Sequence, residues 1–216
     1  MLPRRFAKIQ QVLRQRQPDL TVLLENVHKP HNLSAILRTC DAVGILDVHA
    51  VTPEQTVPTF NSTAQGSQKW ITLHAHPSIT TAIQQLQSQN FQVCAAHLSE
   101  TAVDYRAIDY CQPTAILLGT EKWGVSPATI ELVDRHIIIP MFGMVQSLNV
   151  SVANAVILFE AQRQRLEAGY YQHPRLATSQ YQQKLFEWSY PALAAQYQAK
   201  QQPYPKLDET GNILTP

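Results

Sequence analysis

Residues 137–165 constrain the fold more than any other part of this sequence. A run of three isoleucines ends at Pro140, a polar loop that includes Ser147 follows, and residues 149–168 have the pattern of a long amphipathic helix. A strand, a polar loop and a helix in this order are how open α/β sheets build ligand sites at the carboxyl ends of their strands. The segment therefore predicts an α/β fold with a ligand site at this loop, but it does not name the ligand.

The rest of the chain repeats this alternation of apolar runs and helical stretches. The predicted strands are 20–27, 47–52, 69–75, 91–97, 114–119 and 136–140, and the predicted helices are 4–16, 32–43, 78–89, 127–134 and 149–168. Strands that alternate with helices predict a mostly parallel sheet flanked by helices. Beyond this region Tyr181, Leu185 and Trp188 fall at helical spacing, which predicts one more helix ending before Pro191. The Pro-rich and polar segment 200–216 is expected to be loosely ordered.

Composition limits the class of protein. The three cysteines, Cys40, Cys94 and Cys111, are odd in number and far apart, which indicates buried thiols in a reducing cytosol. No apolar run reaches the length of a membrane span, and the basic N-terminus lacks the apolar stretch of a signal peptide. The eight histidines lack metal-ligand spacing. We therefore expect a cytoplasmic protein with neither a metal nor a membrane as partner.

The net charge of +1 hides an uneven distribution. Residues 1–38 contain seven basic and two acidic side chains, residues 39–162 contain four and ten, and residues 163–216 contain six and four. A basic end joined to an acidic body suggests a polyanionic partner that the end contacts. A solvated helix face would give the same run of charges, so both interpretations stay open at this point.

The predicted helix that begins at Asn32 has one polar edge. Arg38 points away from the apolar stripe, and His31 and Ser34 lie on nearly the same face as Arg38; the stripe consists of Leu33, Ile36, Leu37 and Cys40. Arg38 is either an ordinary exposed arginine or a fork for a phosphate or a developing oxyanion, with Asn32 and His31 as helpers.

Glycines are concentrated in two loops. Gly119, Gly124 and Gly143 are three of the seven glycines in the chain, and they follow two predicted strands. Such glycines indicate either ordinary turns or backbone that approaches a ligand closely. Neither loop has the spacing of a Rossmann dinucleotide site or of a Walker A phosphate site.

The three segments together resemble the SpoU branch of the SPOUT RNA methyltransferases. The first motif of that family is matched by Asn32, Arg38 and Gly44, the second by Leu118, Gly119, Thr120, Glu121 and Gly124, and the third by 139–141 with 147–151. Their order and spacing cover residues 32–160, and all three motifs are intact.

The resemblance implies a SPOUT fold with a C-terminal trefoil knot, a rare exception to unknotted topology. It implies S-adenosylmethionine as the cofactor, RNA as the substrate and a homodimer in which the apolar face of 149–160 is partly buried against the partner. The short basic N-terminal helix favours the members that methylate the ribose 2′-oxygen of guanosine 18 in the D-loop of tRNA. The expected parts are a basic RNA-contacting helix at 1–18, a catalytic domain at 19–168 and a helical extension with a loose tail at 169–216.

The same resemblance assigns roles to individual residues. The implied catalytic set is Arg38, Asn32, Glu121, Ser147 and Asn149. The implied cofactor-binding set is Ala96, Gly119, Ile139 and Leu148. The expected RNA-binding set combines the basic residues of both ends with His31; it consists of Arg4, Arg5, Lys8, Arg16, His31, Arg163, Arg165 and Arg175.

Two alternatives remain beside this interpretation. The chain could be a SpoU enzyme that acts on rRNA or on another tRNA position. It could also be a catalytically silent RNA-binding relative, although the intact Arg38, Glu121 and Ser147 favour an enzyme.

Overall fold

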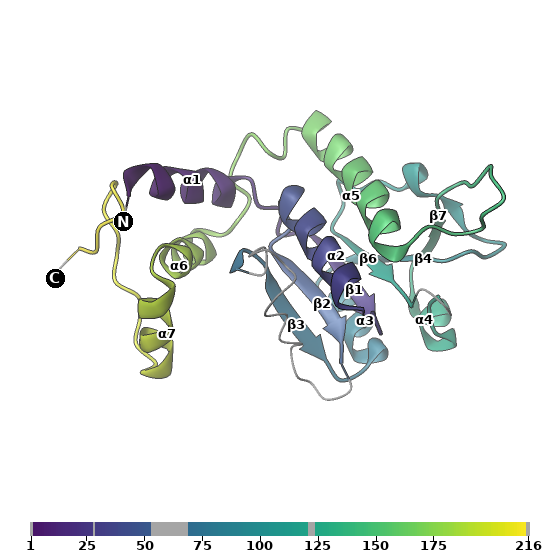
Figure 1. The fold of residues 1–216 in the computed structure, drawn as a ribbon, viewed down its shortest axis with the longest axis horizontal. Coiled ribbons are helices and arrows are strands. Elements are labelled where there is room, and N and C mark those ends of the chain that lie inside the picture. Colours follow the sequence, from purple (N-terminus) through teal and green to yellow (C-terminus); the bar gives the residue numbers. More distant parts are fainter. Residues whose placement is uncertain (1, 28, 53–68, 121–123, 215–216) are drawn as a thin grey trace. The chain divides into compact units, whose positions relative to one another are not determined.

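A computed structural model describes residues 2–27, 29–52, 69–120 and 124–214. The chain forms two compact units. One consists of Pro18–Ala168, and the other combines the two ends of the chain, Met1–Gln17 and Gly169–Pro216 (Figure 1). No sequence pattern indicates that the two ends of the chain form one unit, because they are more than 150 residues apart.

A seven-stranded sheet forms the centre of the 18–168 unit, in the order β3-β2-β1-β6-β4-β7-β5. Every pair of neighbouring strands is parallel, which confirms the predicted α/β class. The strands are β1 (Leu20–Glu25), β2 (Asp47–Val51), β3 (Thr72–His76), β4 (Gln92–Ala96), β5 (Val103–Asp104), β6 (Thr114–Leu118) and β7 (Arg135–Ile138).

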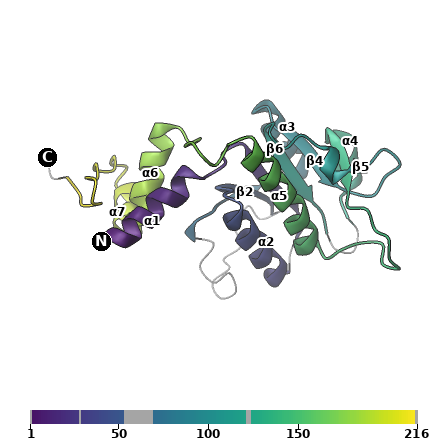
Figure 2. The same ribbon diagram turned by 90° about the horizontal axis from the view of Figure 1, so that it is seen from above.

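Helices cover both faces of this sheet, so its central strands are buried on both sides. The α2 helix (Pro30–Ala42) and the α5 helix (Val150–Glu167) lie side by side on one face in both views (Figures 1 and 2). The α3 helix (Ile79–Ser88) and the α4 helix (Pro127–Leu132) pack against the other face. All residues of β1 and β6 are buried, as expected of parallel strands between two helical layers.

The six predicted strands and the five predicted helices are confirmed, with ends that shift by up to three residues. The α2 helix begins at Pro30 instead of Asn32, because proline is well suited to the first turn of a helix. The β5 strand was not predicted. It pairs with β7, but its two residues are too few to produce a periodic pattern. A 3-10 turn, η2 (Tyr105–Ala107), follows it directly.

The unit made of the two ends contains three helices. The α1 helix (Pro3–Arg14) buries Phe6, Ile9 and Leu13 and packs against α6 (Thr178–Ser189). The helix predicted around Tyr181–Trp188 is therefore confirmed, whereas α7 (Pro191–Ala199), which begins at the proline, was not predicted. The tail after α7 also makes contacts, because the Tyr190 hydroxyl donates to the Gly211 carbonyl oxygen at 2.7 Å.

No helix of the described residues has both the length and the apolarity that a membrane crossing requires.

Candidate active site

Three neighbouring strands end side by side at one edge of the sheet. Ala96 is the last residue of β4, Gly119 follows β6, and Ile139 follows β7. In the strand register Ala95 pairs with Leu117, and Ala96 pairs with Ile137. The structure thus brings the expected cofactor-binding residues Ala96, Gly119 and Ile139 to the same edge, where open α/β sheets bind ligands.

The loop after β6 is closed by two backbone hydrogen bonds. The Thr120 N–H donates to the Gly124 carbonyl oxygen at 2.8 Å, and the Gly124 N–H donates back to Thr120 at 2.9 Å. Gly124 has a φ of +67°, a conformation that favours glycine. Glu121, an expected catalytic residue, lies outside the described residues.

Gly119 is required by the protein's own backbone. A Cβ atom placed on Gly119 would lie 2.1 Å from the Gly124 carbonyl oxygen and 2.6 Å from the Val125 nitrogen. Both distances are far below contact distance, so any side chain at position 119 forces the loop to move. The glycine therefore first serves the closed loop, whatever ligand the strand edge binds.

A hydrogen bond joins the first and third motifs. The Asn149 side chain caps the start of α5 by accepting from the Ser151 N–H at 2.8 Å, and its Nδ2 donates to the Asn32 Oδ1 at 3.3 Å. Asn32 is 2% exposed, and its own Nδ2 has no hydrogen-bond partner within the described part of the chain. A buried donor without a partner is costly, so this amide is suited to a ligand oxygen.

Arg38 lies on α2 nearly two turns after Asn32 and is exposed. Among the described residues, no hydrogen bond or ion pair engages its guanidinium, so all of its donors remain open to solvent or to a ligand. Ser147 and His31 are also exposed, and Leu148 is half-buried next to Asn149. The structure thus links Asn32 directly to Asn149, and it relates Arg38 and Ser147 to that pair through a shared helix and a shared loop.

His97 is a polar side chain that the sequence analysis missed at this edge. It follows Ala96, and its Nδ1 lies 3.7 Å from the position that a Cβ of Gly124 would take. Burial lowers the pKa of His97, and the neighbouring charge of His136 lowers it further. The ring therefore favours its neutral form beside the loop.

The basic residues expected to contact RNA fall into distinct environments. Arg4, Arg5 and Lys8 are exposed on α1, away from its buried face. Arg14, further along the same helix, lines a shallow groove of about 330 Å³ together with Ala7, Gln10, Gln11, Gln15, Tyr171 and Gln172. This part of α1 offers both cations and amides to a partner.

Arg165 and Arg16 differ from that expectation, since both are 0% exposed. The Arg165 guanidinium forms an ion pair with Asp19 and donates to the Tyr110 carbonyl oxygen at 2.9 Å. The Arg16 guanidinium lies 5.1 Å from the centre of the Trp188 ring. Both side chains hold their own units together, so their expected contact with RNA is corrected to a structural role.

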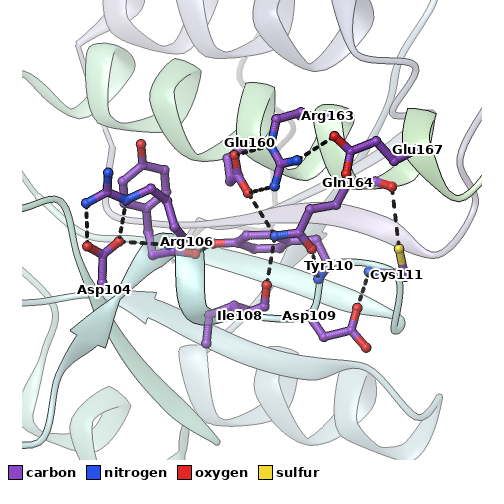
Figure 3. Close-up of polar contacts among 11 residues, drawn as sticks. Asp104, Arg106, Ile108, Asp109, Tyr110, Cys111, Glu160, Arg163, Gln164 and Glu167 are labelled. Atoms are coloured by element: carbon purple, nitrogen blue, oxygen red, sulfur yellow. Dashed lines mark hydrogen bonds and ion pairs between the residues drawn. The ribbon is translucent and has the colours of Figure 1, made fainter.

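Arg163 is exposed, but its charge is offset within α5 (Figure 3). It donates to Glu160 at 2.8 and 2.9 Å and to Glu167 at 2.6 Å. Next to it Gln164 joins α5 to the 108–110 segment, accepting from the Tyr110 N–H at 2.9 Å and donating to the Ile108 carbonyl oxygen at 3.0 Å.

Arg175, in the other unit, stacks on Tyr170 with 3.8 Å between its guanidinium carbon and the ring centre. Its planar face is thus engaged by a ring of its own unit, which distinguishes it from the cations of α1.

The cysteines are free. Cys40 and Cys94 are buried as expected, whereas Cys111, which was also expected to be buried, is only partly buried. Burial raises the pKa of the Cys94 thiol to about 12, which makes it a poor nucleophile. Within the described ranges, no group of three or more His, Cys, Asp or Glu side chains is placed to hold a metal ion.

Comparison with known proteins agrees with this geometry. The model of the SpoU rRNA methylase family matches residues 19–159, and the model of the SpoU rRNA methylase C-terminal region matches residues 163–216. The tRNA (guanosine(18)-2′-O)-methyltransferase of Thermus thermophilus is 62% identical over 184 residues, which cover 85% of this chain and 95% of the relative.

Solved structures show the same likeness. The crystal structure of the A. aeolicus TrmH/SpoU tRNA modifying enzyme is 42% identical with a TM-score of 0.82, and the match covers 88% of this chain and 97% of that one. The AdoMet-bound rRNA methyltransferase of Sinorhizobium meliloti is 32% identical with a TM-score of 0.62, covering 71% and 59%. This chain therefore belongs to the SpoU rRNA methylase family.

Proposed function

We propose that this protein transfers a methyl group from S-adenosylmethionine to the ribose 2′-oxygen of guanosine 18 in the D-loop of tRNA. The observation that carries the proposal is the Asn32–Asn149 hydrogen bond, which joins two of the three family motifs; Asn32 lies on the helix that also carries the exposed Arg38. The reaction is the one for which the relative with 62% identity is named, and that relative matches 85% of this chain.

The edge formed by β4, β6 and β7 fits the cofactor. It combines backbone polar groups at the strand ends with the half-buried side chains of Ile139 and Leu148, a surface that suits a flat base with polar edges. Ala96, Gly119, Ile139 and Leu148 would hold S-adenosylmethionine, which supplies a methyl group already activated by its sulfonium. The related S. meliloti structure is AdoMet-bound, which supports this assignment.

Because the methyl group is activated, the protein's task is to position the 2′-oxygen and to stabilise it as its proton leaves. A free guanidinium is essentially never deprotonated, so Arg38 is a poor base. Arg38 instead holds the developing oxyanion and the neighbouring phosphate, while the proton passes to water or phosphate. Its open donors are consistent with this role.

The other motif residues set the geometry around that oxygen. Asn32 offers its buried Nδ2 as a donor, and Asn149 orients Asn32 through their hydrogen bond. Ser147 orients the ribose or the loop, and Glu121 helps Asn32 to set the geometry around the 2′-oxygen. Together these residues place the nucleotide, whereas Arg38 carries the electrostatic part of the catalysis.

We assign methyl transfer to residues 19–168 and RNA capture to the flanking segments 1–18 and 169–216. Arg4, Arg5, Lys8 and Arg14 contact phosphates, and we propose that His31 and Arg175 add to these contacts. Phosphate contacts set affinity without reading sequence, so guanine is selected elsewhere. We also propose that the protein acts in the cytoplasm, where it would meet tRNA.

We further propose a homodimer and a C-terminal trefoil knot, as the family implies. Val152, Phe159 and Leu166 recur every seven residues on the outer face of α5, and each is about half exposed, at 47, 51 and 53%. An apolar stripe of this spacing suits a partner helix. Replacing Phe159 with Glu should convert a dimer to a monomer in sedimentation; a parent that already sediments as a monomer would contradict the proposal.

The direct test of the proposed reaction uses two forms of one tRNA transcript. One form carries guanosine at position 18, and the other carries 2′-deoxyguanosine there. With labelled S-adenosylmethionine, only the first should accept the methyl group. Equal labelling of both forms would show that the acceptor lies elsewhere.

A further inference from the structure

We propose that Glu25 is a positioning residue that fixes Val125 and Ser126 next to Gly119, at the end of β6 that binds the cofactor, an inference that rests on the proposed function. Glu25 is the last residue of β1 and is 3% exposed, although it carries a carboxylate. A buried carboxylate without partners is strongly unfavourable, so its contacts indicate its role.

Two donors converge on one oxygen of this carboxylate. The Ser126 N–H donates to Oε2 at 3.0 Å, and the Thr129 hydroxyl donates to the same atom at 2.9 Å. Ser126 also caps α4, because its Oγ accepts from the Thr129 N–H at 3.3 Å. Glu25, Ser126 and Thr129 therefore form a closed ring of three hydrogen bonds between β1 and the start of α4.

This ring fixes the far end of the loop that follows β6. The near end is fixed by the Thr120–Gly124 pair, where Gly119 leaves no space for a Cβ. Glu25 itself lies one residue beyond the Leu24–Leu118 pair of the β1–β6 register. Gly119 follows β6 directly, and Ser126 is tied to β1 through Glu25. Loss of Glu25 would therefore release Ser126 from β1 while leaving the Thr120–Gly124 pair in place.

Glu25 also connects two motifs. The chain turns immediately after it at Asn26, which has a φ of 57°, and then enters α2 with Asn32 and Arg38. One residue therefore joins the strand leading to the Arg38 helix with the loop of the second motif. Loss of its contacts should impair cofactor binding more than RNA binding, because the RNA-contacting cations lie on α1.

The test compares four variants by their KM for S-adenosylmethionine and, separately, their KM for tRNA. Glu25→Ala leaves two donors without an acceptor and should raise the cofactor KM about tenfold. Thr129→Val keeps the shape but removes one donor and should raise it about threefold. Glu25→Gln keeps an acceptor oxygen and should stay within about twofold of the parent. The KM for tRNA should hardly change in any of them.

Thr21→Val is the matched control. Thr21 is buried on the same strand and donates to the Asp47 carbonyl oxygen at 2.6 Å, at the opposite end from the cofactor edge. The Thr21→Val variant should have a lower melting temperature than the parent and an unchanged cofactor KM.

An unchanged cofactor KM in Glu25→Ala would overturn the inference, as would equal rises in the two KM values. If Glu25→Ala does not fold, an unchanged cofactor KM in Thr129→Val would overturn it instead. Methylation of guanosine 18 by the parent protein is read separately, so the proposed function can stand when this inference fails.

Discussion

At the scale of single residues, Arg38 is the group that the proposed chemistry needs most. Arg38→Ala should lower turnover by at least about a hundredfold, the loss typical of removing one donor to a developing oxyanion. Arg38→Lys should also be poor, because a point charge cannot reproduce the planar fork. Cofactor affinity, measured by calorimetry, should persist in both variants.

Arg135→Ala provides the control, since Arg135 is exposed but begins β7, at the opposite end of that strand from Ile139. It should retain parental turnover. Near-normal turnover in Arg38→Lys would contradict the fork interpretation.

A second residue-scale prediction concerns pH and His49. Burial, together with the charges of His74 and His76 and against the opposing effect of Asp47, lowers the pKa of His49 from an ordinary 6.5 to about 4. At pH values between about 4 and 6.5, the unfolded chain therefore binds a proton on His49 that the folded chain does not bind. The difference corresponds to about 3 kcal/mol of stability, present above pH 6.5 and lost as the pH falls toward 4.

Denaturant unfolding from pH 4 to pH 7 measures this loss. His49→Gln should have a shallower pH dependence of the free energy of unfolding than the parent, while the exposed His173 provides a control in His173→Gln. A parental slope in His49→Gln would assign the pH dependence to other groups.

At the scale of elements, the loop after β6 has less freedom than its glycines suggest. Gly119→Ala should destabilise the fold by about 1–3 kcal/mol and weaken cofactor binding, because its Cβ overlaps the Gly124 carbonyl. Gly143→Ala should be neutral to within about 0.5 kcal/mol, because no atom lies within 4 Å of its Cβ position. Thermal melting measures the stability of each variant, and calorimetry measures its cofactor binding. Equal stability of the two variants would contradict the argument that a Cβ at position 119 clashes with the Gly124 carbonyl oxygen.

The positive charge of the α1 helix should strengthen RNA binding. Replacing Arg4, Arg5 and Lys8 together with Ala should raise the KM for tRNA and reduce the salt slope of binding by about 2 to 3. The methylated position and the cofactor affinity should not change.

Arg163→Ala removes the charge of an exposed arginine that is paired with Glu160 and Glu167, so it should leave the salt slope nearly intact. A triple variant with the parental slope would show that the charges of α1 do not contact phosphate.

Most elements could be predicted from the sequence, because buried strands and amphipathic helices leave periodic patterns. The exceptions have physical reasons. The β5 strand is two residues long, and α7 begins at a proline that also marks the end of α6. The burial of Arg165 could not be predicted from its charge, since the partners that compensate it, Asp19 and Tyr110, lie 146 and 55 residues away.

The site shows the same limit. Motif spacing identified Asn32 and Asn149, but their hydrogen bond depends on the packing of α2 against α5. Glu25 gave a weak signal as the one charged residue of its strand, and its donors lie 101 and 104 residues later in the chain. The ligand contact of the Gly119 backbone stays a prediction, and no sequence pattern indicates that its Cβ position is closed by the backbone of Gly124 and Val125.

At the scale of the whole molecule, the proposed function divides methyl transfer and RNA capture between two units. Pro18–Ala168 contains the three motifs, and the unit made of the two ends contains the exposed cations of α1. Both ends are basic in the sequence, and α1 packs against α6 within their shared unit. This arrangement would let affinity for RNA change without altering the chemistry at the sheet edge.

The measurement that tests the account most directly maps the 2′-O-methylated nucleotide after total tRNA and 23S rRNA from an unmodified source are incubated with the protein and S-adenosylmethionine. The account predicts methylation at guanosine 18 of tRNA, dependent on the cofactor and lost in Arg38→Ala. Methylation at another tRNA position or in 23S rRNA, or none under conditions where both RNA and cofactor bind, would contradict it.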